Sequence, residues 1–385
     1  MKSLKLVILY SIKSYKGPDH TFPGVEQWRI EGETGGENKG KNMKAVVKIK
    51  KGKGFVEYKE MPRPQITEDE VLIEVKAASV CGSDIHIYHD EHPNWPPMIM
   101  GHELSGVIAE VGSRVKNRKT GDRVVTETRT KSCGICLYCE TGKPHICPDK
   151  RPLGIGVDGA MAKYVAVPGK LIHRLPETIG FVEASLCEPL AVCVHGLIER
   201  TGINAGDTVL ISGPGPIGLI CLQLAKAAGA YVLVAGTSRS ADLKLKRAME
   251  LGADEIIDAG KENVVERVKK ASGGYGADVV VEASGAPLAI KTAFESLRRQ
   301  GKLCAMGITG KPAAEMPWDT AIFKAAQVTF CFSSSWSGWE TGIKMLERKQ
   351  INLAKLVTHE LPLEKWKEGF EAMEAGKAIK VVLIP

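Results

Sequence analysis

Four cysteines lie close together about a third of the way along the chain. They follow the spacing Cys133-x2-Cys136-x2-Cys139-x7-Cys147, in a segment that also contains Gly134, Gly142 and Pro144. Thiolates are good ligands for zinc, and four of them close a tetrahedral site that stabilises the fold but leaves no position for a substrate. Incidental buried cysteines and an iron–sulfur cluster are the alternatives. The density of thiols favours a structural zinc site in a lobe over residues 131–148.

A second group combines residue types that suit an open metal site. Its members are Cys81, His102, Glu103 and, much later in the chain, Glu188. Thiolate, imidazole and carboxylate are all zinc ligands, and a site with an exchangeable position is catalytic rather than structural. Taken alone, His102-Glu103 is typical of a solvated turn, and Cys81 of a small buried side chain.

Two neighbours of Cys81 strengthen the catalytic interpretation. Ser83 and His86 offer a hydroxyl and an imidazole that could pass a proton from a metal-bound alcohol to solvent. Together with Glu103, which is expected to act both as a ligand and in catalysis, they are the predicted catalytic residues.

The third motif is rich in glycine. It reads Gly213-Pro-Gly215-Pro216-Ile217-Gly218, follows the apolar run TVLIS and precedes the helical pattern IGLICLQLAKAA. In a strand–turn–helix context, such glycines allow a tight turn and close approach of the backbone to a pyrophosphate at the helix N-terminus. The alternative is a purely structural glycine turn. The context favours a dinucleotide-binding site.

The choice of nicotinamide cofactor depends on residues about 20 positions further on, after the next strand. The sequence there reads Thr237-Ser238-Arg239, with no acidic residue to hold a ribose 2′-hydroxyl. A hydroxyl donor and a cation suit a 2′-phosphate, so NADP is favoured over NAD. Alternatively, Arg239 is a solvated loop residue, and the backbone or Thr237 holds the ribose.

The elements that must position these motifs fall into two regions. Segments such as MKAVVKI and EVLIEVKAAS predict strands from Met43 to about residue 170, separated by short turns, which indicates a barrel-like antiparallel region. Near residue 191 the period becomes helical, and strands then alternate with helices. That alternation predicts an α/β region with a doubly wound parallel sheet. Residues 1–42 lack periodicity and are interpreted as a poorly specified extension.

Composition limits the class of protein to which the chain can belong. The chain has 385 residues, of which 44% are hydrophobic, and a net charge of +7 that is spread along the sequence. Two globular domains are therefore expected, with no concentrated basic face for nucleic acid. The chain shows neither a long apolar span nor a secretory signal. We therefore expect a cytoplasmic location and no membrane partner.

These residues resemble the zinc-dependent medium-chain alcohol dehydrogenases, in the branch of polyol (sorbitol-like) and threonine 3-dehydrogenases. The resemblance runs from Met43 to Pro385. It implies a GroES-like β-barrel catalytic domain over residues 43–190 and 326–385, and a Rossmann domain over 191–325. It also implies that the catalytic zinc is held by Cys81, His102 and Glu103, with Glu188 binding it directly or through water. Ser83 and His86 match the proton-relay positions, and the four clustered cysteines match a structural zinc lobe.

The resemblance leads to a functional hypothesis. The chain is expected to transfer hydride between a secondary alcohol of a polyol or sugar derivative and NADP or NAD, with two zinc ions per chain, as a homodimer or homotetramer. Cys331-Phe332 departs from the Arg-Tyr pair of animal sorbitol dehydrogenases, which argues against sorbitol itself. Oxidation of an amino alcohol such as threonine is the alternative substrate class, and a non-catalytic dinucleotide sensor is the alternative class of protein. The extension before Met43 is interpreted as a mis-called start or a lineage-specific addition.

Overall fold

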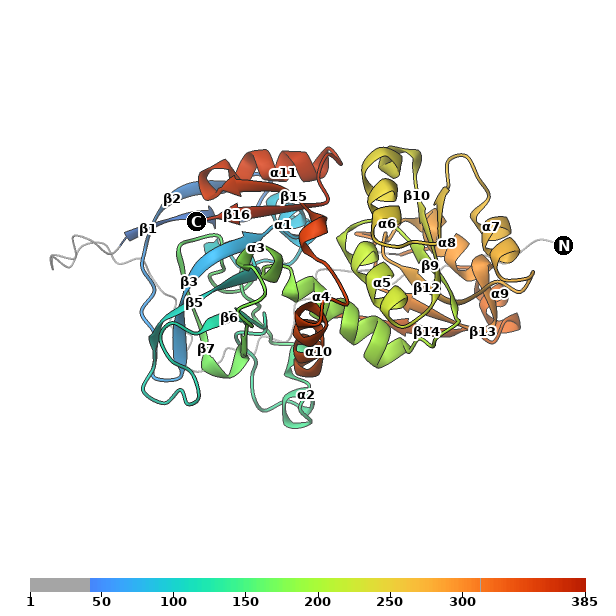
Figure 1. Ribbon diagram of the computed structural model, residues 1–385. Coiled ribbons are helices and arrows are strands. Elements are labelled where there is room, and N and C mark those ends of the chain that lie inside the picture. Colours follow the sequence, from blue (N-terminus) through green and yellow to red (C-terminus); the bar gives the residue numbers. More distant parts are fainter. Residues whose placement is uncertain (1–41, 312) are drawn as a thin grey trace, which may run out of the picture.

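The computed structural model describes residues 42–311 and 313–385, which form three β-sheets with helices packed around them (Figure 1). Of the predicted extension over residues 1–42, all but Asn42 lies outside the described residues. The strands are β1 (Asn42–Lys48), β2 (Val56–Pro62), β3 (Glu70–Ser79), β4 (Met98–Ile99), β5 (Glu103–Val111), β6 (Arg123–Thr126), β7 (Tyr164–Pro168), β8 (Ile172–Arg174), β9 (Thr208–Ser212), β10 (Tyr231–Gly236), β11 (Glu255–Asp258), β12 (Ala277–Glu282), β13 (Leu297–Ala305), β14 (Gln327–Phe330), β15 (Val357–Pro362) and β16 (Lys380–Ile384).

Helices connect and cover these sheets. The α-helices are α1 (Gly82–Tyr88), α2 (Leu137–Glu140), α3 (Phe181–Ala184), α4 (Cys187–Cys193), α5 (Pro216–Ala227), α6 (Lys246–Glu250), α7 (Val264–Ala271), α8 (Pro287–Ser296), α9 (Trp318–Phe323), α10 (Trp336–Glu347) and α11 (Trp366–Glu374). Two π-helical stretches cover Val194–Thr201 and Ala241–Leu245. Short 3-10 turns cover Pro144–Ile146, Gly169–Leu171, Ser238–Ser240, Ala354–Leu356 and Leu363–Lys365.

The first region is the predicted barrel-like domain. A three-stranded sheet has the order β2-β1-β4, and a seven-stranded sheet has the order β15-β16-β3-β5-β6-β8, with β7 on β3. Along β3, Val71, Ile73 and Val75 are buried in one core cluster with Val165 and Val167 of β7. Alternate residues of a strand point to the same face, so this spacing places the apolar side chains of both strands in the barrel core.

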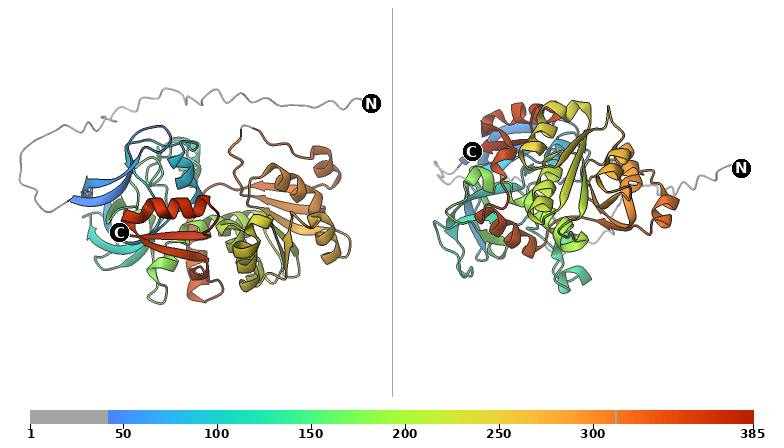
Figure 2. Two further views of the ribbon diagram at one scale, coloured as in Figure 1. Left: turned by 90° about the horizontal axis from the view of Figure 1, so that it is seen from above. Right: turned by 45° about the vertical axis from the view of Figure 1, so that its right-hand side comes forward.

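The carboxyl-terminal segment returns to the barrel. Strand β16 is antiparallel to β3 and parallel to β15. The last residues of the chain therefore lie in the same sheet as β3 (Figure 2). The barrel is therefore discontinuous in sequence. This return carries Lys380, the first residue of β16, to the edge where the predicted catalytic residues lie.

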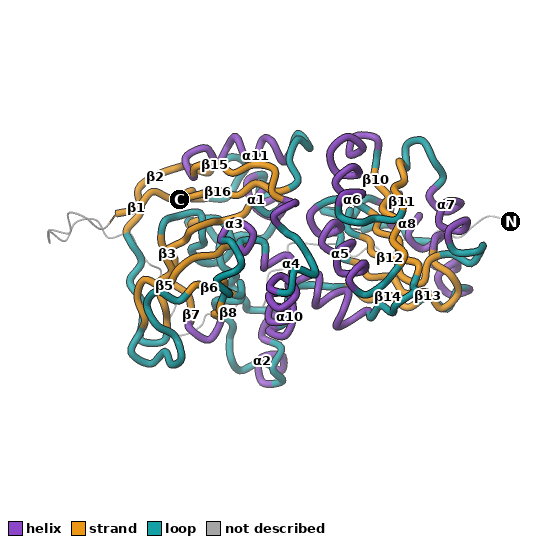
Figure 3. The backbone as a smooth tube through the Cα atoms, viewed as in Figure 1, coloured by secondary structure: helices purple, strands orange, loops and turns teal. Residues whose placement is uncertain are grey.

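The second region is a six-stranded parallel sheet with the order β11-β10-β9-β12-β13-β14. Val209 and Ile211 of β9 join one core cluster with helix α5, while Leu210 joins another with helices α7 and α8. The sheet is thus covered by helices on both faces, as the alternating pattern predicts (Figure 3). The α/β fold class, with a GroES-like barrel and a Rossmann-type doubly wound sheet, is confirmed.

One predicted boundary differs from the sheet topology. The predicted domain boundary at residue 326 assigns β14 to the barrel, but β14 pairs with β13 in parallel register. The connection through α9 returns the chain in the same direction as β13, as a parallel pair requires. The six-stranded sheet therefore extends to Phe330.

None of the helices in residues 42–311 and 313–385 is both long enough and apolar enough to cross a membrane.

Candidate functional site

Cys81, His102 and Glu103 come together on the barrel. One ligand atom from each lies within 4.8 Å of those of the other two. Cys81 immediately precedes helix α1, while His102 and Glu103 lie at the start of β5. Gly101 has φ +89°, and a side chain there would meet Met161 at 2.7 Å, so glycine permits the turn that directs the next two residues inward.

Asp84 holds this group in place. Its carboxylate accepts the backbone N–H of Cys81 at 2.9 Å and lies 3.6 Å from Nδ1 of His102. Burial opposes the charged imidazole, but the Asp84 carboxylate outweighs this and raises the pKa of His102 well above its ordinary value. With Nδ1 facing Asp84, the other ring nitrogen, Nε2, is left for a ligand. A carboxylate behind a histidine is the usual way in which a metal-binding imidazole is oriented.

Glu103 is fully buried and is held by two other side chains. The Lys380 ammonium donates to its carboxylate at 2.6 Å and to the carbonyl of Val80 at 2.9 Å. The hydroxyl of Ser79 also donates to Glu103. Burial opposes the charge on Lys380, yet Glu103 raises the pKa of the ammonium. This buried ion pair links β16 to β5 across the sheet.

Glu188 lies in the first turn of α4, beside the same group but outside the 4.8 Å set. Burial raises the pKa of its carboxyl to about 7. The charge of His102 lowers this pKa, and that of Glu103 raises it. The structure thus brings Glu188 near the other three predicted ligands without placing it among them.

The two predicted relay residues, both on α1, behave differently. The hydroxyl of Ser83 lies 3.3 Å from Nε2 of His102, within reach of the open side of the group. The His86 ring is exposed, and its Nδ1 lies 3.0 Å from a carboxylate oxygen of Glu91. Among the hydrogen bonds of the described residues, none joins Ser83 to His86, so a transfer between them needs a bridging hydroxyl or water.

The four clustered cysteines also converge. Their sulfurs lie within 4.8 Å of one another, in the lobe around α2, and none of the ten cysteines forms a disulfide. The backbone N–H of Cys136 donates to the sulfur of Cys133 at 3.3 Å. Hydrogen bonds from backbone N–H groups, that of Ile135 first, lower the pKa of Cys133 to about 7 and favour its thiolate. A compact set of four thiols with N–H donors aimed at sulfur suits a closed tetrahedral metal site.

The glycine motif joins β9 to α5. Gly213 has φ +105°, and a side chain on Gly218 would meet the Gly213 carbonyl oxygen at 2.0 Å, so both positions require glycine. A side chain on Gly215 would meet nothing within 4 Å, which leaves open space at the N-terminus of α5. Helix α5 begins at Pro216, followed by Ile217. The loop therefore has the close packing and the free approach that a dinucleotide pyrophosphate needs.

A cavity of about 250 Å³ lies beyond the end of β10, between the six-stranded sheet and helix α11. It is lined by Thr237, Arg239, Ser240, Lys244, Met373, Glu374 and Gly376. The guanidinium of Arg239 donates to the backbone carbonyl of Glu374 at 3.1 Å. Ser238, predicted to face the cofactor, does not line this cavity, because its hydroxyl donates to the Asp258 carboxylate at 2.8 Å.

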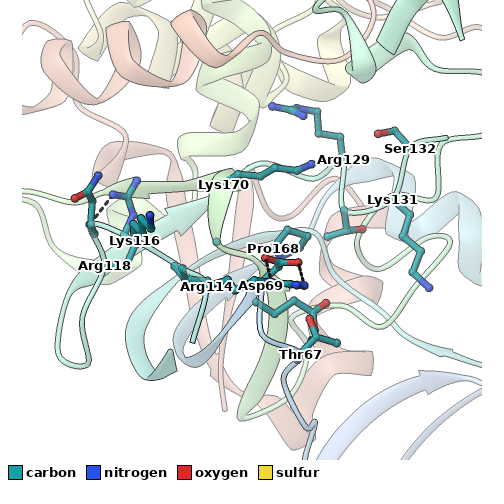
Figure 4. Close-up of a pocket in the computed structure, with 15 residues that line it drawn as sticks. Thr67, Asp69, Arg114, Lys116, Arg118, Arg129, Lys131, Ser132, Pro168 and Lys170 are labelled. Atoms are coloured by element: carbon teal, nitrogen blue, oxygen red, sulfur yellow. Dashed lines mark hydrogen bonds and ion pairs between the residues drawn. The ribbon is translucent and has the colours of Figure 1, made fainter. Parts of the chain in front are cut away.

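Another hollow lies on the barrel surface and has a volume of about 860 Å³. Its walls carry cationic side chains, and Arg114 pairs there with Asp69 (Figure 4). None of the predicted site residues lines it.

Three residues of the site were not identified from the sequence. Asp84 lies within the Cys81 motif, but its role depends on the fold. Lys244 lines the cavity beside Arg239. Lys380 interrupts the apolar run AIKVVLIP, and a lysine in an otherwise buried strand is a signal that could have revealed it.

Comparisons with known proteins identify the family. Residues 67–177 match the model described as "Alcohol dehydrogenase GroES-like domain", and residues 216–348 match "Zinc-binding dehydrogenase". A sorbitol dehydrogenase of Halalkalibacterium halodurans is 40% identical over 89% of this chain and 99% of its own length. An L-threonine 3-dehydrogenase of Bacillus velezensis is 38% identical over 90% of this chain and 100% of its own length.

A solved structure gives the same result. A zinc-binding dehydrogenase from Sinorhizobium meliloti, bound to NADP, matches with a TM-score of 0.82 and 30% identity, covering 89% of this chain and 99% of that one. The barrel and the parallel sheet agree with these matches. The chain therefore belongs to the zinc-dependent medium-chain alcohol dehydrogenases, in the branch that includes polyol and threonine dehydrogenases, and is an NAD(P)-dependent alcohol dehydrogenase.

Proposed function

We propose that this enzyme reversibly oxidises a secondary alcohol of a polyol or sugar derivative to the ketone, with transfer of hydride to a nicotinamide cofactor. The observation that carries the proposal is the convergence of Cys81, His102 and Glu103 on the barrel, with Ser83 at its open side. The barrel, residues 43–190 with 331–385, would position the alcohol, and residues 191–330 would hold the cofactor.

The group around Cys81 fits a zinc ion. It offers a thiolate, an imidazole nitrogen and a carboxylate, and Nδ1 of His102 is a buried atom turned to Asp84 rather than to the other ligands. Glu188 would complete the set from the side, directly or through water. Bound zinc would supply Lewis acidity, which lowers the pKa of the substrate hydroxyl toward neutrality.

The side chains around the group have separate tasks. The Ser83 hydroxyl would accept the proton of the alcohol and pass it, through one bridging hydroxyl or water, to the exposed imidazole of His86. Lys380 would hold the Glu103 carboxylate in place. Asp84 would keep the His102 ring in the orientation that leaves Nε2 free.

The four-cysteine lobe would hold a second zinc ion. Because four thiols leave no open position, this ion would fasten the loop around α2 and take no part in the reaction. The proposal gives two zinc ions per chain, a ratio that elemental analysis of the purified enzyme measures directly.

NADP is the favoured cofactor. Arg239 and Lys244 line one cavity beyond β10, and two cations there suit the 2′-phosphate that distinguishes NADP from NAD. Thr237 lines the same cavity and would contact the ribose. Similar structures contain either cofactor, NADP in that from Sinorhizobium meliloti and NADH in an alcohol dehydrogenase from Escherichia coli, so the choice depends on Arg239 and Lys244.

Replacing Arg239 tests this choice of cofactor. Arg239→Ala is expected to raise KM for NADP by about 10-fold or more, because a charge-assisted hydrogen bond is lost, and to leave KM for NAD nearly unchanged. Steady-state kinetics with both cofactors would measure the effect. Arg118→Ala is a matched control, because Arg118 also donates to a backbone carbonyl but lies on the barrel. Equal losses with NADP and NAD would contradict the assignment.

Turnover of a substrate panel tests the proposed activity. Polyols should be oxidised more efficiently than L-threonine, and the 38% identity to an L-threonine 3-dehydrogenase makes threonine the alternative substrate to include. Preferred turnover of threonine would replace the polyol assignment. Cofactor binding without turnover of any alcohol would instead favour a dinucleotide sensor.

We further propose that the chain forms a homo-oligomer through the outer strand of the parallel sheet. Strand β14 is at the edge of that sheet, and large apolar side chains around it are exposed. They are Ile308, Trp318, Ile322, Phe323 and Phe330. Such an edge is a template for strand pairing. Light scattering should show a dimer or tetramer, and a monomer at micromolar concentration would contradict this arrangement.

A further inference from the structure

Five of the ten cysteines belong to neither metal-binding group. They are at positions 187, 193, 221, 304 and 331, and all lie in or against one core cluster between the parallel sheet and helix α5. Within this cluster, the sulfurs of Cys304 and Cys331 lie 3.6 Å apart. Two thiols in contact form a pair that an oxidant can join, whereas a single buried thiol is inert.

Neighbouring strands bring these two thiols together. Cys304 lies in β13, opposite Thr329 of β14. Cys331 follows Thr329 by two residues, so its side chain points to the same face as that of Cys304. A disulfide bond is about 2.05 Å long, so the sulfurs must approach by about 1.5 Å to form one. Strand β14 ends at Phe330, and Cys331 can therefore move without the loss of a longer ladder of hydrogen bonds.

The two thiols differ in their access to solvent. Cys304 is fully buried, whereas Cys331 is partly exposed and lines a cavity of about 340 Å³. The wall of this cavity includes Glu282, Ala305 and Phe330, the last residues of β12, β13 and β14. A small oxidant can therefore reach Cys331 through the cavity, and Cys304 reacts only through Cys331.

The surroundings of Cys331 favour its thiolate. The guanidinium of Arg200 donates to the carbonyl of Phe330 at 2.6 Å, one residue before Cys331. The hydrogen bond with Cys304 lowers the pKa of Cys331, and the charge of Arg200 lowers it further. The same hydrogen bond, together with burial, raises the pKa of Cys304. Because the thiolate is the form that reacts with an oxidant, Cys331 is the attacking sulfur and Cys304 the second one.

We infer that Cys331 and Cys304 form a site of reversible oxidation by peroxide, at which the two residues join as a disulfide. The Cys331 thiolate attacks one oxygen of hydrogen peroxide, and the O–O bond breaks. This leaves a sulfenic acid on Cys331 and a hydroxide, which takes up the proton of the Cys331 thiol as water. The sulfur of Cys304 then attacks that of Cys331, the S–O bond breaks, and a second water leaves with the Cys304 proton. Two thiols and one peroxide thus give one disulfide and two waters.

The disulfide would act on cofactor binding. In an open parallel sheet, ligands bind at the carboxyl ends of the strands, and Cys331 lies at that edge. Joining the two sulfurs shifts the chain that follows Phe330, so oxidation should weaken binding of the nicotinamide cofactor. This consequence rests on the proposed function, whereas the oxidation itself does not.

Peptide mapping of the wild-type enzyme tests the oxidation without any variant. Trypsin places Cys304 and Cys331 in separate peptides, residues 303–324 and 325–344, each with a single cysteine. After treatment with hydrogen peroxide and alkylation of free thiols, we expect one linked species, two hydrogen atoms lighter than the two reduced peptides together. Dithiothreitol should separate it. Two alkylated peptides and no linked species, or Cys331 oxidised alone, would overturn the inference.

Titration with reduced cofactor tests the consequence. Peroxide should raise the Kd of the wild-type enzyme for NADPH or NADH, whichever binds more tightly, by about tenfold, the effect of one misplaced hydrogen-bonding group. Dithiothreitol should restore the original Kd. Cys331→Ala should prevent the rise, because the attacking sulfur is missing. Cys221→Ala is the matched control and should respond as the wild type does, since Cys221 is buried in the same cluster but lines no part of the cavity.

The outcomes separate the oxidation from the cofactor effect. A linked peptide with an unchanged Kd would overturn the effect on the cofactor. An equal rise in Kd in Cys331→Ala would assign that rise to other thiols and would also overturn it. A reduced wild-type enzyme that binds no nicotinamide cofactor would instead overturn the proposed function, and the linked peptide would still establish the oxidation site.

Discussion

Replacing Cys81 with serine should abolish alcohol oxidation while leaving the protein folded. In the proposed site Cys81 supplies one metal ligand, and a bound metal would contribute several kcal/mol of charge stabilisation in the transition state. Because each factor of ten in rate corresponds to about 1.4 kcal/mol, kcat/KM is expected to fall by at least about 1000-fold. Zinc content should fall from two ions per chain to one, as measured by elemental analysis beside steady-state kinetics.

The matched control is Cys139→Ser in the four-cysteine lobe. It replaces the same atom in the other proposed metal site and should also cost one zinc ion. Here the main loss is expected in thermal stability and not in the chemical step, because a closed site contributes to folding. A Cys81→Ser enzyme that keeps two zinc ions and more than a tenth of wild-type kcat/KM would exclude the Cys81 group as the catalytic centre.

The two motifs that sequence analysis located most sharply are local in the chain. The four cysteines belong to one loop, and the glycines between β9 and α5 form a single turn. The spacing of these residues in the sequence is therefore enough to predict that they lie close together. The identities of Gly213 and Gly218 also follow from local constraints, a left-handed φ at the first and a carbonyl contact at the second.

Contacts between distant segments could not be predicted in the same way. Lys380 meets Glu103 only because β16 returns to pair with β3, and no local pattern encodes that return. Ser238 is predicted to contact the cofactor, and the sequence does not reveal that its hydroxyl donates to Asp258 of the neighbouring strand. Strand β14 has a sequence that suits either sheet, and the connection through α9 decides which one it joins.

Loss of the Lys380 ammonium is the second change with a large expected effect, and it acts on stability. Lys380→Met leaves the Glu103 carboxylate buried with only the hydroxyl of Ser79. Breaking a buried ion pair by removing one partner costs roughly 3–5 kcal/mol, because the remaining charge is uncompensated. We expect the free energy of unfolding of the metal-free protein to fall by about this amount in chemical denaturation with a chelator present.

Zinc should reduce this loss, since a cation bound at Glu103 replaces part of the missing positive charge. The destabilisation caused by Lys380→Met is therefore expected to be smaller with zinc than with chelator. A double variant, Glu103→Gln with Lys380→Met, should be more stable than Lys380→Met alone in the metal-free state, because no charge is left unpaired.

The control for this series is the same substitution in an exposed pair. Lys44 pairs with Glu60 at 3.4 Å, with more than half of each side chain exposed, and Lys44→Met should change stability by less than about 1 kcal/mol. If Lys380→Met proved no more destabilising than Lys44→Met, the Lys380–Glu103 ion pair would contribute no net stability to the metal-free protein. The lysine would then contribute packing to the strand β16 and not charge to the metal site. If the loss were large but insensitive to zinc, Glu103 would be a structural anchor of the barrel, and the metal would be held without it.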